Sequence, residues 1–371
     1  MKTLLFGNGI NIQFGGSDNY NSSIILRAIK NTKDSDYPKH IIVDDPSLIL
    51  SLLGYLFLEV RDILAHRYDS YAFTIDEKQS LEDFIRRYGT CKSISIPDIG
   101  FEDYYLIYDL FCYKKKIVNP DRYDIREALK AFFLYSIYNR GRVNEIHKRY
   151  PAKLKDLFSG YDSFFTTNYD MNVEMFTKKT VNYLHGAFNI KAEVYNPNSL
   201  RNQMSDSPLK GYDVDVNFFY LYSNALTTYS GNQKLFRIKQ GMQANEAVRK
   251  FAYAYHNDPA IKSSIEEWEN DTNSLVRNLN EATRLKASDP DLNFDETYPI
   301  KDFEAIEGTI SVLGLSPNND THIFKMINDN PKITKVIYYY HADEEKSQVN
   351  KLITSHPLEY EDVKLVWKIY R

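Results

Sequence analysis

Cysteine is nearly absent from this chain of 371 residues, which contains only Cys91 and Cys112. Neither residue belongs to a Cys-x-x-Cys pair, so a four-cysteine zinc site is excluded. A mixed site would need histidines at unusual positions in the sequence. We therefore expect no bound zinc and no metal cofactor.

Long apolar runs are also absent. The longest one, residues 48–58, is interrupted by Ser51 and Gly54, and it is shorter than the roughly 17–25 residues that a membrane-spanning helix needs. Residues 1–3 lead directly into a strand-like run and leave no room for a signal peptide. We expect a cytoplasmic protein that does not enter a membrane.

Positive charge is not in excess, because the net charge is −4. This balance argues against a large nucleic-acid footprint. Two basic clusters, Lys114-Lys115-Lys116 and Arg140-Gly141-Arg142, could still contact nucleic acid, although a charged run on a helix is more often a solvated face. The chain also lacks a Gly-x-Ser-x-Gly motif, a His-Glu-x-x-His motif and a Walker loop.

Strands and helices are expected to alternate at both ends of the chain, which predicts an α/β fold with a Rossmann-like parallel sheet. The expected strands are residues 3–6, 161–166, 180–184, 309–313, 335–340 and 363–369. The expected helices of this part are residues 22–31, 320–328 and 344–353. The core would then consist of residues 1–45, 159–190 and 305–371.

Two large insertions separate the pieces of this core. Residues 46–158 show helical spacing of apolar residues after a helix start at Asp45-Pro46. The only strand signal in that insertion is at residues 93–96. The second insertion, residues 191–304, is expected to be irregular up to 235 and helical over 236–287.

The first motif that bears on function is Gly7-Asn8-Gly9, which follows a strand-like run. Such a turn can bring backbone N–H groups close to a phosphate. The third glycine of a dinucleotide-binding fingerprint is missing, because position 12 is Ile. The turn could therefore be purely structural. In the ligand-binding interpretation, Asn11 also lies near the ligand.

The second motif is Thr166-Thr167-Asn168-Tyr169-Asp170, where an apolar strand ends in hydrogen-bonding side chains. Ligands bind at the carboxyl ends of the strands in open α/β sheets. Thr167, Asn168 and Asp170 are therefore candidate binding residues. Asn168 and Asp170 could instead cap the following helix, since Asn and Asp are common helix caps.

Two further strand ends carry candidate site residues. His185 ends one apolar run and precedes Gly186, whereas the other seven histidines lack such a context. Gly314 and Ser316 follow another predicted strand. Residues 318–320 come next and could either bind a ligand or cap the helix that begins at 321.

The order Gly-x-Gly, Thr-x-Asn-x-Asp and His-Gly resembles the sirtuin-like NAD-binding family, specifically its bacterial phage-defence branch with the AbiH-type abortive-infection proteins. The resemblance covers residues 1–20, 160–190 and 308–345. It implies that Asn168 holds the nicotinamide ribose and the attacking water, and that His185 is the general base. It further implies phosphate and adenosine-ribose contacts from the Gly314-x-Ser316 motif, and an adenosine contact from His341.

By this resemblance we expect hydrolysis of NAD to ADP-ribose and nicotinamide, with NAD as substrate and no cofactor. Such an enzyme would deplete NAD during phage infection, so a gated homo-oligomer and a phage-derived activator are implied. Sirtuin deacetylases generally carry a four-cysteine zinc ribbon, and its absence here counts against peptide deacylation. Two alternatives remain: a module that binds NAD or ADP-ribose without cleaving it, and a nuclease subunit with a helicase-like partner.

Overall fold

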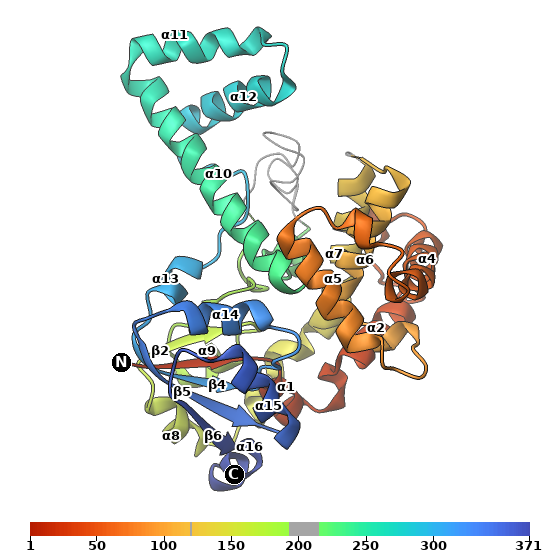
Figure 1. Cartoon of the computed structure of the whole chain (residues 1–371), viewed down its shortest axis with the longest axis vertical. Helices are drawn as coiled ribbons and strands as arrows, with labels where there is room; N and C mark the ends of the chain where they lie inside the picture. Colours follow the sequence, from red (N-terminus) through yellow and green to blue (C-terminus); the bar gives the residue numbers. More distant parts are fainter. Residues whose placement is uncertain (119–120, 193–214) are drawn as a thin grey trace.

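A six-stranded sheet, parallel throughout, forms the centre of the protein (Figure 1). The computed structural model describes residues 1–118, 121–192 and 215–371. The strand order is β3-β2-β1-β4-β5-β6, which is the order of the Rossmann fold. The strands are β1 (Lys2–Phe6), β2 (Ser163–Thr166), β3 (Asn182–Tyr183), β4 (Gly308–Leu313), β5 (Ile333–Tyr340) and β6 (Leu358–Asp362). The predicted α/β class and parallel sheet are confirmed.

Both faces of the sheet are buried, because successive side chains of a strand point to opposite faces. In β1, Leu5 joins one apolar cluster while Leu4 and Phe6 join another. In β2, Phe165 and Phe164 divide in the same way. The alternation explains why the central strands read as continuous apolar runs in the sequence.

Short helices cover the two faces of the sheet (Figure 1). The first cluster, around Leu5, includes residues of α13 (Ile300–Glu304), α14 (Thr321–Asp329) and α15 (Asp343–Leu352). The second, around Leu4, includes residues of α1 (Gly9–Gly15), α8 (Leu154–Ser159), α9 (Asn172–Thr177) and α16 (Val363–Ile369).

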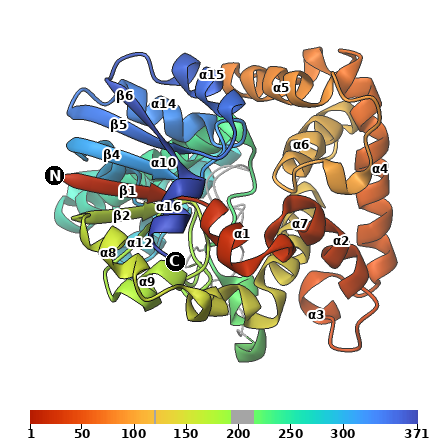
Figure 2. The same cartoon turned by 90° about the horizontal axis from the view of Figure 1, so that it is seen from below.

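A helical lobe stands beside the sheet, as the view from below shows most clearly (Figure 2). It contains α2 (Asn21–Asn31), α3 (Lys39–Ile42), α4 (Pro46–Leu64), α5 (Ile75–Tyr88), α6 (Asp103–Lys115) and α7 (Asp121–Tyr138). The predicted helix start is confirmed, since the Asp45 carboxylate accepts the backbone N–H of Ser47 at 2.9 Å and Pro46 occupies the first turn. The strand signal at residues 93–96 was wrong, because Ile96–Asp98 forms a 3₁₀ helix.

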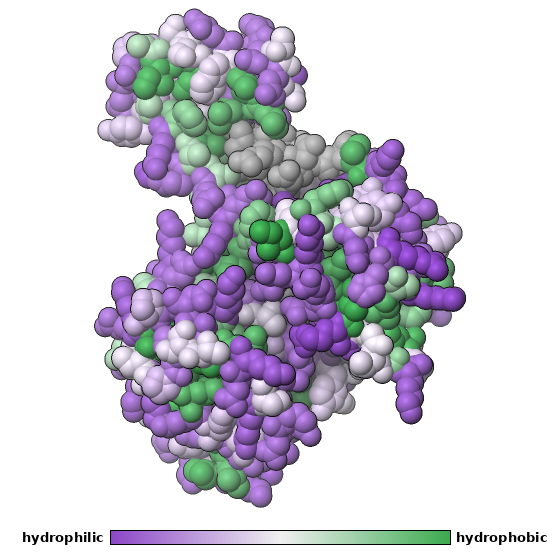
Figure 3. Space-filling view, in the orientation of Figure 1, coloured by the Kyte–Doolittle hydropathy of each residue, from purple (hydrophilic) through white to green (hydrophobic). Residues whose placement is uncertain are grey.

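The second insertion contains a helical arm that projects from the body (Figure 1). The arm consists of α10 (Gly231–Asn257), α11 (Pro259–Glu267) and α12 (Ser274–Ser288). Its apolar residues gather between α10 and α12 and include Val248 and Ala282, while hydrophilic residues cover much of its outside (Figure 3). The helix begins at 231, five positions before the predicted start at 236. Residues 193–214 of the predicted irregular stretch lie outside the described residues.

The C-terminal end of the prediction was wrong in one element. Residues 363–369 form helix α16, and the last strand is Leu358–Asp362. Asp362 ends that strand and caps the helix, because its carboxylate accepts the backbone N–H of Lys364 at 2.8 Å. Val363, Val366 and Trp367 are buried at helical spacing. Within the described parts of the chain, no helix has both the length and the apolar composition that crossing a membrane requires.

A buried ion pair inside the lobe also bonds the residue that precedes the arm. The guanidinium of Arg87 on α5 donates two hydrogen bonds of 2.7 Å to the carboxylate of Asp103 on α6. Ser230, which precedes α10, donates a third to the same carboxylate. Burial alone would raise the pKa of Asp103, but the charge of Arg87 and these hydrogen bonds hold that pKa below its usual value.

We predict that Arg87→Met lowers the free energy of unfolding by about 3–5 kcal/mol, because it leaves the Asp103 carboxylate buried and unpaired. Arg86→Met is the control: Arg86 is exposed and pairs with Asp83 at the surface, so its loss should cost no more than about 0.5 kcal/mol. Denaturant unfolding of both variants measures the difference. Equal stability of the two variants would contradict the assignment.

Candidate functional site

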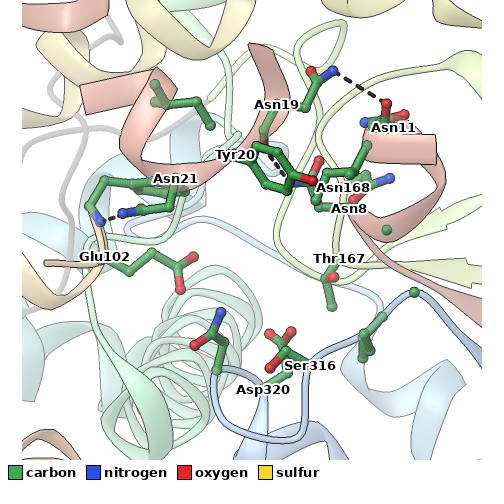
Figure 4. Close-up of a pocket in the computed structure, with 18 of the residues that line it drawn as sticks. Asn8, Asn11, Asn19, Tyr20, Asn21, Glu102, Thr167, Asn168, Ser316 and Asp320 are labelled. Atoms are coloured by element: carbon green, nitrogen blue, oxygen red, sulfur yellow. Dashed lines mark hydrogen bonds between the residues drawn. The ribbon is translucent and has the colours of Figure 1, made fainter. Parts of the chain in front are cut away.

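A pocket of about 630 Å³ opens at the carboxyl ends of the central strands. It lies where the strand order reverses between β1 and β4, which is the position at which doubly wound sheets bind ligands. One side of the lining comes from the loops after β1, β2, β3 and β4. The helical lobe supplies the opposite side. Figure 4 shows polar side chains, Asn168, Glu102 and Asp320 among them, around this space.

The loop after β1 is fixed against the loop after β4 by backbone contacts. The N–H of Gly7 donates to the carbonyl of Leu313 at 3.0 Å, and the N–H of Gly9 donates to the carbonyl of Gly314 at 2.9 Å. A Cβ at Gly9 would lie 2.5 Å from the Cα of Gly314, which itself has a φ of +71°. Both glycines are therefore needed for this approach. The two N–H groups are already paired within the protein, so a phosphate would meet other donors.

Asn11 and Asp170, predicted to contact the ligand, are joined to each other in a buried network. The amide of Asn11 donates to the Asp170 carboxylate at 2.6 Å. The same carboxylate accepts the backbone N–H of Asn172 at 3.0 Å. Burial raises the pKa of Asp170 above its usual value, while these hydrogen bonds oppose the rise. Asn8 immediately precedes α1, and its side-chain amide donates to the carbonyl of Asn19 at 2.8 Å.

Asn168 lies on the pocket wall and carries an unsatisfied donor. Its backbone N–H donates to the hydroxyl of Thr166 at 3.0 Å, which fixes the turn after β2. Its side-chain Nδ2 is buried and has no hydrogen-bond partner among the described residues. Thr167 lines the same wall. A buried amide without a partner costs about 1–3 kcal/mol, so this group is poised to bond a ligand or water.

His185 also lines the pocket, and the fold pairs it with a second histidine. Its Nε2 lies 3.0 Å from the Nε2 of His322, and the two rings stack with centroids 5.2 Å apart. Burial lowers the pKa of both histidines well below its usual value, and the Lys234 ammonium lowers both further. Gly186 provides the space for this turn, since its φ is +79° and a Cβ there would lie 2.0 Å from the carbonyl oxygen of Asn224.

His322 was missed in the sequence, where it was grouped with the histidines that lack a ligand-like context. It lies in the first turn of α14, directly after the loop that contains Gly314 and Ser316. Its position two residues after Asp320, at the end of a strand–loop segment, is the signal that could have identified it. The Nδ1 of His322 is buried and has no partner among the described residues.

Asp320 immediately precedes α14, and among the described residues its side chain makes no capping hydrogen bond. Burial raises the pKa of its carboxyl to about 7, Lys234 opposes this rise, and Glu102 adds to it. Ligand atoms of His185, Asp320 and His322 all lie within 4.8 Å of one another, so these residues could hold a metal ion. The sequence gives no sign of clustered ligands, because the three residues come from two distant segments.

Glu102 reaches the pocket from the helical lobe and was also missed. Its carboxylate accepts a hydrogen bond of 2.8 Å from the ammonium of Lys234 and one of 3.2 Å from the hydroxyl of Tyr169. Lys234 is fully buried near the base of α10. The sequence assigns Glu102 and Lys234 to two different insertions, and only the fold places them together beside the strand ends.

The other predicted residues lie on the rim of the same pocket. The Ser316 hydroxyl accepts the backbone N–H of Asn318 at 3.3 Å, and Gly314 faces the first loop. His341 follows β5, is exposed, and also borders the pocket. The structure thus brings candidate residues from all four predicted strand ends to one pocket, while Gly7 lies outside its lining.

We predict that Gly9→Ala destabilises the fold by roughly 1–3 kcal/mol, since the added methyl must force apart two backbone segments. The control is Gly54→Ala in the middle of α4, where a Cβ meets nothing within 4 Å. That change should raise stability by about 0.5–1 kcal/mol through helix propensity. Thermal unfolding of the two variants and of the wild type measures both changes in stability.

If Gly9 served only to admit a ligand, Gly9→Ala would keep its unfolding temperature and lose nucleotide affinity. Calorimetric titration of NAD in a His185→Ala background distinguishes these roles. Unchanged stability of Gly9→Ala would contradict the structural role.

Comparison with known proteins gives no relative for this chain: no protein-family model, no curated protein and no solved structure matches it.

Proposed function

We propose that this protein hydrolyses NAD to ADP-ribose and nicotinamide. The observation that carries the proposal is the buried Nδ2 of Asn168, which has no partner among the residues that the structure describes. Asn168 lines the same pocket as His185 at the switch point of the sheet. A pocket of about 630 Å³ falls within the range of small-molecule and cofactor sites. The resemblance of the strand-end motifs to sirtuin-like enzymes supports the same assignment.

The reaction breaks the bond between C1′ of the ribose and the nicotinamide nitrogen. The electron pair stays on the ring nitrogen, so nicotinamide leaves as a neutral molecule. Water adds to C1′ and releases one proton. Asn168 suits the placement of the ribose and the water, because an amide both donates and accepts hydrogen bonds without adding charge. Its vacant Nδ2 donor supports this role.

His185 is assigned the role of general base toward a ribose hydroxyl. Burial keeps its imidazole neutral, which is the form that has a lone pair to accept a proton. Its ring is held by the stacked His322 and by the turn at Gly186. General base catalysis typically contributes about 10²–10⁴ in rate.

Carboxylates near the pocket favour the positive charge of the transition state. As the glycosidic bond breaks, charge develops on the ribose in an oxocarbenium-like state. Glu102 and Asp320 both line the pocket, and Lys234 neutralises only part of their charge. In a site with a low effective dielectric, such a field is stronger than in water. In this proposal the carboxylates, and not a metal ion, stabilise the charge that develops on the ribose.

Depletion of NAD would serve abortive infection, in which an infected cell stops supporting phage growth. Such an activity must be restrained in healthy cells, so we propose control by a trigger or by homo-oligomer formation. The helical lobe and the arm both reach the site, through Glu102 and Lys234.

Of the two basic clusters proposed for nucleic acid, one has Lys114 paired with Glu59 and the other has Arg140 paired with Asp34.

We predict that His185→Ala and Asn168→Ala each reduce nicotinamide release at least about a hundredfold, because one removes the base and the other the ribose-positioning amide. The assay follows nicotinamide from purified protein incubated with NAD, in the activated state if the basal rate is low. Circular dichroism verifies that both variants are folded.

The matched control is His256→Ala, which alters an exposed histidine in the last turn of α10 and should retain the wild-type rate. Wild-type release by either folded pocket variant would contradict the proposal. If the wild-type protein binds NAD in a calorimeter but releases no nicotinamide, the protein is instead a nucleotide-binding module.

A further inference from the structure

The cluster of His185, Asp320 and His322 is a second feature of the pocket, and it shares His185 with the proposed nucleotide site. We infer that these three side chains bind one divalent transition-metal ion of the zinc type, and that the bound ion inhibits the hydrolase. The first half depends only on the cluster. The second half rests on the proposed function, because it concerns the base assigned to His185.

The geometry of the cluster is close to that of a metal centre. In a tetrahedral site with Zn–N bonds of about 2.05 Å, two ligand nitrogens lie about 3.3 Å apart. The two Nε2 atoms are already 3.0 Å apart. All ligand atoms lie within 4.8 Å of one another, so closure around an ion needs movements on the order of 1 Å.

The short contact between the two imidazoles needs one hydrogen or one metal ion between the facing nitrogens. Two Nε2 lone pairs facing each other at 3.0 Å would repel, so without a metal one Nε2 carries a hydrogen and donates it to the other, as two neutral imidazoles can do. A metal ion can replace that proton and accept both lone pairs. Both rings are buried, which removes water as a competing partner.

The charges and ligand types around the cluster select the ion. Glu102 and Asp320 carry two negative charges against the single positive charge of Lys234 when both are ionised. Two imidazoles with one carboxylate suit zinc and related transition metals, whereas Mg²⁺ prefers oxygen ligands. Because His185 and Asp320 line the pocket, a fourth coordination position would face the cavity.

Metal binding and the assigned base role exclude each other at His185. A neutral imidazole has one nitrogen lone pair, and a coordinated imidazole has donated it. A ribose hydroxyl then has no base to accept its proton. The ion would therefore hold the enzyme inactive, and a chelator would leave the activity unchanged or increase it.

The test for binding is calorimetric titration of Zn²⁺ into the full chain after dialysis against a chelator, with elemental analysis of the washed complex. We expect one ion per chain for the wild type and no binding of Mg²⁺. Tetrahedral Co²⁺ absorption should appear with the same stoichiometry. His322→Gln and Asp320→Asn should each weaken Zn²⁺ binding more than about 100-fold. Loss of a group that only supports a metal ligand typically weakens binding by about 10–100-fold.

Matched controls are His256→Ala and Asp329→Asn, which alter a histidine in the arm and the last residue of α14. Both should retain the wild-type affinity. The site assignment is overturned if the wild type binds no stoichiometric zinc, or if His322→Gln and Asp320→Asn, both folded, retain wild-type affinity. Circular dichroism of each variant identifies a loss of fold.

The test for inhibition measures nicotinamide release with and without Zn²⁺. We expect zinc to suppress release by the wild type more than tenfold, and we expect His256→Ala to be suppressed equally. Release that increases with zinc, or that is unaffected at saturating zinc, overturns the inhibitory role. Stoichiometric zinc binding without nicotinamide release under any condition would leave the metal site established and refute the proposed hydrolase.

Discussion

The contact between two backbone loops, one after β1 and one after β4, is the constraint on which the site depends. Gly9 and Gly314 approach so closely that neither position has room for a side chain. This approach packs the two loops together at the switch point of the sheet, where both glycines line the pocket. The residues that follow each loop, Asn11 on one side and Ser316 on the other, then receive fixed positions.

The parts of this site that could be predicted from sequence are those encoded in short segments. A buried parallel strand is a run of apolar residues, and its carboxyl end is marked by a change to small or polar residues. Asn168, His185 and Gly314 each follow such a run, and the structure brings all three to one pocket. Local patterns therefore identified the sheet and one wall of the cavity.

The remaining parts depend on contacts between distant segments, which no local pattern contains. Glu102 and Lys234 lie in separate insertions and meet only because α10 packs beside the lobe. His322 looked unremarkable because its partner, His185, belongs to another segment. The error at residues 363–369 has a different cause: β-branched and aromatic residues favour a strand, yet burial of Val363, Val366 and Trp367 follows helical spacing.

The length of helix α10 would amplify any small rotation at its base. It has 27 residues, so it is about 40 Å long, and Lys234 lies on its first turn. A tilt of about 5° about that end moves Lys234 by a few tenths of an ångström but moves the far end by about 3.5 Å. If α10 is rigid, any rotation at the Lys234–Glu102 pair would therefore be amplified at the tip of the arm.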